Sequence, residues 1–168
     1  MKLIAARTSQ TPLIANFDFN WNNWVIDSAD GAKKTLGSTV ALSTDPSESG
    51  LTGAVAATIV FDCIPLPAGA VICGGEAVVE TAYAGSTAAT VSLGIAGSTT
   101  ALLSAFDMKA AAGTRTALTL ATTPLLSNSA GANLRATIAY TVANATAGKV
   151  RLRVMYTVDG RSNEVMTA

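Results

Sequence analysis

Residues 134–158 read LRATIAYTVANATAGKVRLRVMYTV. Apolar and polar side chains alternate over 134–142 and again over 150–158, and Ala147-Gly148 is a turn signal between the two runs. A period of two predicts β-strands that bury one face and leave the other in water. The stretch therefore predicts two half-buried strands of an antiparallel sheet.

The same alternation recurs towards the N-terminus. It covers 55–63, 71–80, 89–95 and 118–121, and turn residues fall between the runs at 65–69, 85–86, 97–98 and 128–131. Six strands with one wet face each predict an all-β fold, an antiparallel β-sandwich or barrel.

One stretch departs from the alternation. Over 99–112, Leu102, Phe106 and Ala110 are spaced at i, i+4 and i+8, and Gly113 follows. This spacing is compatible with one short helix near 99–112 at the edge of the sandwich.

The first 45 residues differ in composition from the rest, because they hold both tryptophans and two of the four phenylalanines. We interpret residues 1–16 as an extended arm and 17–42 as added edge strands or a projecting hairpin. The chain then divides into an N-terminal arm with edge strands or a hairpin, 1–45, and a β-sandwich domain, 46–168.

Composition disfavours several classes of function. The chain of 168 residues has 11 basic and 11 acidic side chains, so no net charge attracts it to nucleic acid or to an anionic membrane surface. It has no histidine, which removes the commonest general base and metal ligand. We therefore expect a structural or binding protein rather than an enzyme, with no cofactor, no metal, no nucleic acid and no membrane.

Two localisation signals are also missing from the sequence. The apolar run at the start stops at Arg7, short of the ~7–15 residues of a signal-peptide core. The most apolar stretch, 51–73, is interrupted by Asp62, Pro65 and Pro67 and cannot be a membrane span. We expect synthesis in a cytoplasm.

The carboxylates and cysteines give no clear catalytic group. Glu76 and Glu80 are four apart on a strand, hence about 13 Å apart on one solvated face, too far for a glycosidase pair. If 65–69 is the turn between adjacent strands, Cys63 and Cys73 lie close to opposite each other and a disulfide is conceivable. Two reduced, buried cysteines are the favoured alternative.

Two groups are candidates for contact with a partner. The basic stripe of Lys149, Arg151 and Arg153, with Arg135 on a neighbouring strand, could meet an acidic partner or nucleic acid, but the favoured alternative is the solvated face of a strand. The second group consists of aromatic side chains set among Asn and Asp, which suits an interface or a core equally well. Our candidate contact residues are Phe17, Phe19, Trp21, Trp24, Arg151 and Arg153.

The middle of the chain carries a distinctive pattern. It consists of Ile64-Pro65-Leu66-Pro67-Ala68-Gly69, the strand that follows, and a Thr-hydrophobe-small-hydrophobe-Gly pattern at 90–94. In this pattern the chain resembles structural proteins of tailed bacteriophages. It implies a capsid decoration or cement protein with a jelly-roll-like β-sandwich. Such a protein binds the major capsid protein on the virion surface, and trimers are the implied homo-oligomer.

Two alternatives stay open. One is the base of a head fibre or a tail-associated virion protein with the same fold. The other is a carbohydrate-binding adhesin module, which would need Trp21, Trp24 and Tyr83 to be exposed and coplanar.

Overall fold

The computed structural model describes residues 11–37, 58–120, 131–141 and 145–158. These residues form ten β-strands and no helix, and none of them forms a helix that could cross a membrane. The strands are β1 (Leu13–Asn20), β2 (Trp24–Ile26), β3 (Lys33–Thr35), β4 (Thr58–Leu66), β5 (Ala70–Ala84), β6 (Ala88–Ile95), β7 (Ser98–Asp107), β8 (Arg115–Ala117), β9 (Ala132–Thr141) and β10 (Ala147–Val158).

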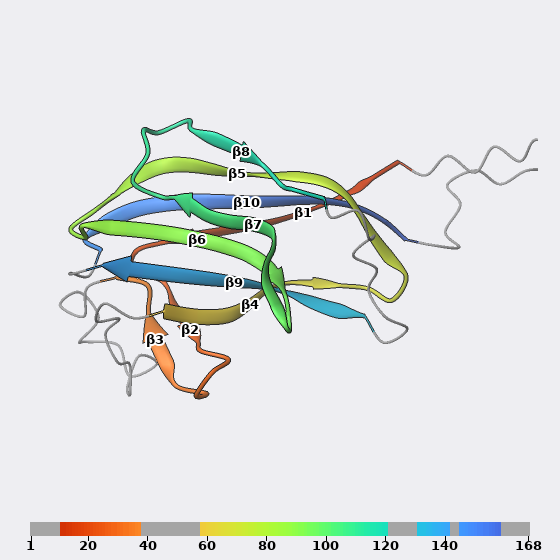
Figure 1. The fold of residues 1–168 in the computed structure, drawn as a ribbon, viewed down its shortest axis with the longest axis horizontal. Helices are drawn as coiled ribbons and strands as arrows, with labels where there is room; N and C mark the ends of the chain where they lie inside the picture. Colours follow the sequence, from red (N-terminus) through yellow and green to blue (C-terminus); the bar gives the residue numbers. More distant parts are fainter. Residues whose placement is uncertain (1–10, 38–57, 121–130, 142–144, 159–168) are drawn as a thin grey trace, which may run out of the picture.

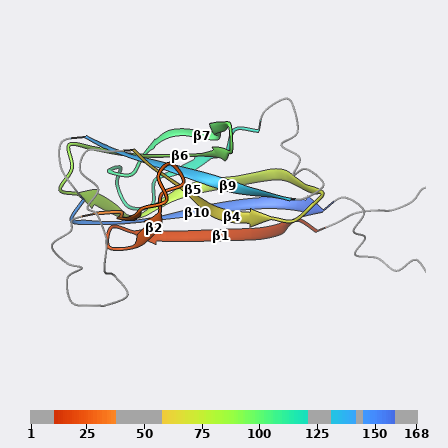
Figure 2. The ribbon, with the colours of Figure 1, turned by 90° about the horizontal axis from the view of Figure 1, so that it is seen from below.

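Eight of these strands form two stacked antiparallel sheets. One sheet has the order β1-β10-β5-β8 and the other β4-β9-β6-β7, while β2 and β3 pair with each other in a small hairpin. Figure 1 shows the two sheets face-on, one behind the other, and Figure 2 shows them edge-on as two layers. The all-β sandwich that the alternation predicts is confirmed.

The strand pairs are nested. The first sandwich strand pairs with the last, β1 with β10, and the second with the second last, β4 with β9. Further in, β5 pairs with β8 and β6 with β7. Successive pairs alternate between the two sheets. Each sheet therefore contains one outer pair, β1–β10 or β4–β9, and one inner pair, β5–β8 or β6–β7.

The core lies between the two sheets. The inward side chains of β10, Val150, Leu152 and Val154, are fully buried, and so are Leu134 and Ile138 on β9. All five are apolar positions of the alternating stretch 134–158. Burying a side chain of this size contributes about 1.5–3 kcal/mol, so the alternation there reports the core directly.

The short helix expected near 99–112 is wrong. Residues 98–107 form β7, which pairs with β6, and Leu102, Leu103 and Phe106 are all buried. The register against β6 shifts between the pairs Val91–Phe106 and Leu93–Leu103, and Ala105 in this bulge has a φ of 48°. The extra residue of the bulge places Leu103 and Phe106, three positions apart, on the same buried side. This i, i+3 spacing imitates that of a helix.

The β4 and β5 strands do not form a hairpin within one sheet, since β4 belongs to one sheet and β5 to the other. Cys63 and Cys73 therefore do not lie opposite each other, and both are free thiols. Cys73 is exposed, whereas the Cys63 thiol donates to the carbonyl oxygen of Leu134 at 3.3 Å. Burial raises the pKa of Cys63 to about 12, so this thiol is unreactive at neutral pH.

The N-terminal region contributes a full strand to the sandwich. β1 runs antiparallel to β10 over eight consecutive residue pairs without a register shift. The β2–β3 hairpin follows and projects beside the end of β4 (Figure 1). Residues 1–10 and 38–45, which include most of the expected arm and the expected domain boundary, lie outside the described residues.

Candidate functional site

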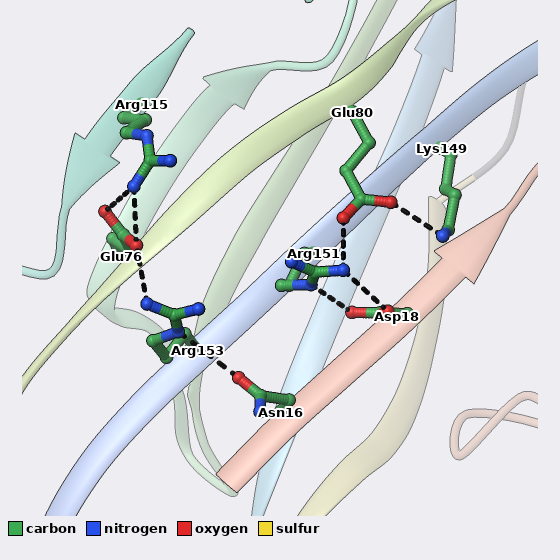
Figure 3. Close-up of polar contacts among 8 residues, drawn as sticks. All are labelled: Asn16, Asp18, Glu76, Glu80, Arg115, Lys149, Arg151 and Arg153. Carbon is green, nitrogen blue, oxygen red and sulfur yellow. Dashed lines mark hydrogen bonds and ion pairs between the residues drawn. The ribbon is translucent and has the colours of Figure 1, made fainter. Parts of the chain in front are cut away.

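A ladder of charged side chains covers the outer face of the β1-β10-β5-β8 sheet. The outward positions of β10 carry the basic stripe, and the strands on either side supply acidic or amide partners. We call this set the charge ladder. Its members are Asn16, Asp18, Glu76, Glu80, Arg115, Lys149, Arg151 and Arg153 (Figure 3).

Arg151 is the centre of the ladder. Its guanidinium donates to both carboxylate oxygens of Asp18, from Nε at 2.9 Å and from Nη2 at 3.3 Å, and it also pairs with Glu80. Glu80 holds the Lys149 ammonium at 2.6 Å. The hydrogen bond with Asp18 raises the pKa of Arg151 further. The charges at this end of the ladder are thus satisfied within the chain.

Glu76 links the other end of the ladder. It accepts from Arg153 at 3.3 Å and from Arg115 at 3.1 Å, and Arg153 also donates to the amide oxygen of Asn16 at 3.4 Å. Glu76 and Glu80 are therefore bridges between cations on neighbouring strands.

Arg135 does not belong to this stripe. It lies on β9 in the other sheet, where its Nε donates to Asp62 at 2.7 Å. The expectation that it neighbours Arg151 and Arg153 is wrong, because a chain that alternates between sheets separates strands that are consecutive in sequence.

The β2–β3 hairpin is attached to the sandwich through a buried carboxylate. Asp27 is 1% exposed and accepts from the Lys34 ammonium at 2.6 Å and from the backbone N–H of Ala29 and Val60. Burial alone would raise the pKa of Asp27, but these hydrogen bonds and the Lys34 charge outweigh it and lower the pKa. The N–H of Ser28 donates to the Val60 carbonyl, so the hairpin base closes the outer edge of β4.

The hairpin presents two large apolar side chains to solvent. Trp24 is 41% exposed and Ile26 is 56% exposed. The Lys33 ammonium lies 5.0 Å from the centre of the Trp24 ring, a cation–π contact. Exposed aromatic and aliphatic side chains beside a cation are common at protein interfaces.

The other candidate aromatics lie deeper. Phe19 is 1% exposed, and Phe17 packs 6.0 Å from Phe19 and 5.9 Å from Phe61, measured between ring centres. Phe19 is thus a core residue that cannot reach a partner from this fold, which corrects its place among the contact candidates. Phe17 and Trp21 are half-buried against the core.

An aromatic platform for a sugar is not formed. Tyr83, one of its three expected members, is 3% exposed and stacks on Tyr140 with ring centres 6.3 Å apart. The Tyr140 hydroxyl donates to the carbonyl of Leu36 at 2.5 Å. These two tyrosines belong to the core that joins β5 and β9 to the end of the hairpin.

Sequence reasoning found the basic stripe but missed its partners. Asp18, Glu76 and Glu80 all occupy polar positions of an alternating run, and this was the available signal. Which strands flank 149–153 depends on strand order, which one sequence does not give. In the described ranges, no three His, Cys, Asp or Glu side chains converge to hold a metal ion.

No protein-family model and no curated protein matches the sequence. The structure is similar to a chain of a solved structure described as the cyanophage Pam1 capsid asymmetric unit, with a TM-score of 0.54 and 18% sequence identity. The similarity covers 94% of this chain and 94% of that chain. The two chains therefore share a fold over nearly their whole lengths.

Proposed function

We propose that this protein is a structural component of a phage virion that decorates the capsid and stabilises it by binding the major capsid protein. The proposed activity is the burial of surface between shell subunits, and no reaction is catalysed. The observation that supports it most is the fold shared with a chain of the Pam1 capsid asymmetric unit.

The extent of the likeness strengthens the proposal. Because the alignment covers 94% of both chains, the chain of the cyanophage capsid has nearly the same length as this one and no large additional domain. The nested strand pairs, β1 with β10 and β4 with β9, are those of a rolled-up hairpin and support the jelly-roll form of the sandwich.

Two surfaces are candidates for contact with the shell. The first is the hairpin with Trp24 and Ile26, whose apolar area is desolvated at little cost. The second is the charge ladder, where Arg151 and Arg153 are about a third exposed and keep donors available at the rim of a contact. Many identical copies on one shell make weak single contacts collectively strong.

Reconstitution tests the proposal. Phage heads that lack this protein are mixed with the purified chain and imaged by electron cryomicroscopy, and their thermal stability is compared with that of untreated heads. We expect added density at symmetry-related positions on the outer surface and a higher temperature of head disruption. Heads that gain neither density nor stability would refute the decoration role.

A matched pair of variants locates the contact. Trp24→Ala is expected to lower occupancy on the heads, while Leu120→Ala, which removes an apolar side chain of similar exposure (46%) outside the hairpin, is expected to leave occupancy unchanged. A fibre-base or tail role predicts instead that the protein occurs only at unique vertices or on tails.

A further inference from the structure

The outer edge of β1 differs from the other sheet edges. The β4 edge is closed by Asp27 and Ser28, and the β7 edge accepts the N–H of Thr119 at the carbonyl of Leu102, at 2.8 Å. β8 is only three residues long. Among the described residues, β1 pairs along its length with β10 alone, although it is eight residues long and free of bulges. A long, regular edge strand is a template for another strand.

The backbone groups of the β1 edge can be assigned. Trp21 donates its N–H to the Gly148 carbonyl at 3.1 Å, on the β10 side, while the Asn20 N–H is taken by the Asn23 side chain. Since N–H directions alternate along a strand, the N–H and C=O groups of Asn16 and Asp18 point away from β10.

The inner face of β1 is also incompletely covered. Leu13, Ala15 and Phe17 point towards the core but stay partly exposed, whereas Val150 and Leu152 on the adjacent β10 are fully buried. An additional strand beside β1 would cover these side chains and would also form hydrogen bonds with the outward N–H and C=O groups of β1.

We propose that β1 pairs antiparallel with β1 of a second copy of this chain, so that the two four-stranded sheets become one continuous sheet of a dimer. The proposal goes beyond the virion role and does not depend on it. The pairing has a two-fold axis, in contrast to the trimer that the phage resemblance implies.

The side chains select one register for this pairing. In an antiparallel pair opposite residues share a face, and centring the two-fold axis on Phe17 places Phe17 opposite itself and Ala15 opposite Phe19 on the inner face. On the outer face Asn16 then lies opposite Asp18, so an amide can donate to each carboxylate. Shifting the axis to Asp18 would oppose two like charges, which is unfavourable.

A proline substitution tests the pairing. Proline is tolerated on an edge strand where the N–H faces outwards, so we expect Asn16→Pro to fold but to sediment as a monomer. Asn16→Ala removes the same side chain and its contact with Arg153 but keeps the N–H, and we expect it to remain dimeric like the wild type. A monomeric or trimeric wild type in sedimentation velocity at tens of micromolar would refute the proposal.

Disulfide trapping gives a second test that does not depend on the proline variant. In a Cys73→Ser background, Phe17→Cys is expected to cross-link two copies on mild oxidation, because the two positions face each other across the axis within disulfide range. Ala15→Cys is the control, since the two copies of position 15 would be about 13 Å apart. Equal cross-linking at both positions, or none at position 17, would refute this register.

Discussion

The two sheets of the sandwich share one core but differ on their outer faces. The β1-β10-β5-β8 sheet carries the charge ladder, with ionic contacts across three strand interfaces. The outer face of the β4-β9-β6-β7 sheet is filled mainly by Thr, Ser, Ala and Gly, with the Asp62–Arg135 ion pair between β4 and β9. At the edge of this second sheet, Val60 of β4 is bound by a buried carboxylate, Asp27 of the β2–β3 hairpin.

This contrast teaches where the stability of the fold resides. Exposed ion pairs gain little, because water solvates separated charges well and long side chains lose entropy on pairing. Water cannot replace a lost partner of a buried carboxylate, and closely packed backbone has no room to move apart. Changes at such places therefore cost more free energy. We therefore expect the plainer second sheet to be the more sensitive of the two to substitution.

The largest effect is expected for Asp27→Ala. The substitution leaves the N–H groups of Val60 and Ala29 without their acceptor and removes one of the two carboxylates that pair with Lys34, the other being Asp30. Such losses cost about 2–4 kcal/mol of unfolding free energy. Chemical denaturation measures the loss, and a cost below that of the ladder substitutions would contradict the contrast drawn above.

The pH dependence of the same site has a defined sign. The pKa of Asp27 is lowered in the folded chain, so its charge stabilises the fold above the unfolded pKa of about 3.9 and this contribution is lost as pH falls through the folded pKa. Asp27→Asn keeps an acceptor but has no charge. We expect wild type to exceed Asp27→Asn in stability at pH 7 and the difference to shrink below pH ~4. A difference independent of pH would show that the charge is irrelevant.

The next effect concerns Gly94 on the second sheet. A Cβ at this position would lie 2.6 Å from the backbone carbonyl carbon of Thr99, because the first residues of β7 lie against Gly94 of β6. Backbone cannot move aside as a flexible side chain can, so Gly94→Ala should cost about 1–3 kcal/mol. Gly97→Ala is the control for strain alone, since Gly97 has a φ of 87° and open space around it. It should cost about 1–2 kcal/mol, and a larger loss at 97 than at 94 would contradict the argument from backbone contact at Gly94.

A smaller effect is expected from the centre of the charge ladder. Arg151→Ala removes the contacts with Asp18 and Glu80, but the site is open to water. We expect a loss of stability smaller than that of Gly94→Ala. This loss of stability should become smaller still in about 1 M salt, where the Debye length falls to about 3 Å. Thermal unfolding at low and high salt measures it, and a salt-independent loss would indicate packing rather than charge.

Much of the fold was predictable from sequence because alternation reports burial directly. Val150, Leu152 and Val154 are apolar in the sequence and buried in the structure. The failure at 99–112 has an equally direct cause. A bulge at Ala105 breaks the period of two, and pattern reasoning has no independent sign of a bulge.

The candidate surfaces were less predictable, because they depend on which strands become neighbours. Arg151 lies 133 residues after Asp18 in the chain, yet the two side chains are 2.9 Å apart. Trp24 and Phe19 look alike in sequence, as aromatics among Asn and Asp, but only Trp24 is exposed. Long-range register decides both outcomes, and it is a property of the whole fold.

The smallest effect is expected on the outer face of the β4-β9-β6-β7 sheet, at a position away from both the Gly94 contact and the Asp27 attachment. Thr90 lies on the outer face of β6 between Ala139 of β9 and Asp107 of β7, and it is partly exposed. A lysine there can extend to water and lies across from the Asp107 carboxylate, so Thr90→Lys should change stability by less than about 0.5 kcal/mol. Chemical denaturation beside Gly94→Ala gives the comparison. If Thr90→Lys costs as much as Gly94→Ala, the absence of charge is itself required for this sheet to fold. If Thr90→Lys costs much less, the small residue at Gly94 is required by the β7 backbone that lies against it, and other positions on this outer face tolerate larger side chains.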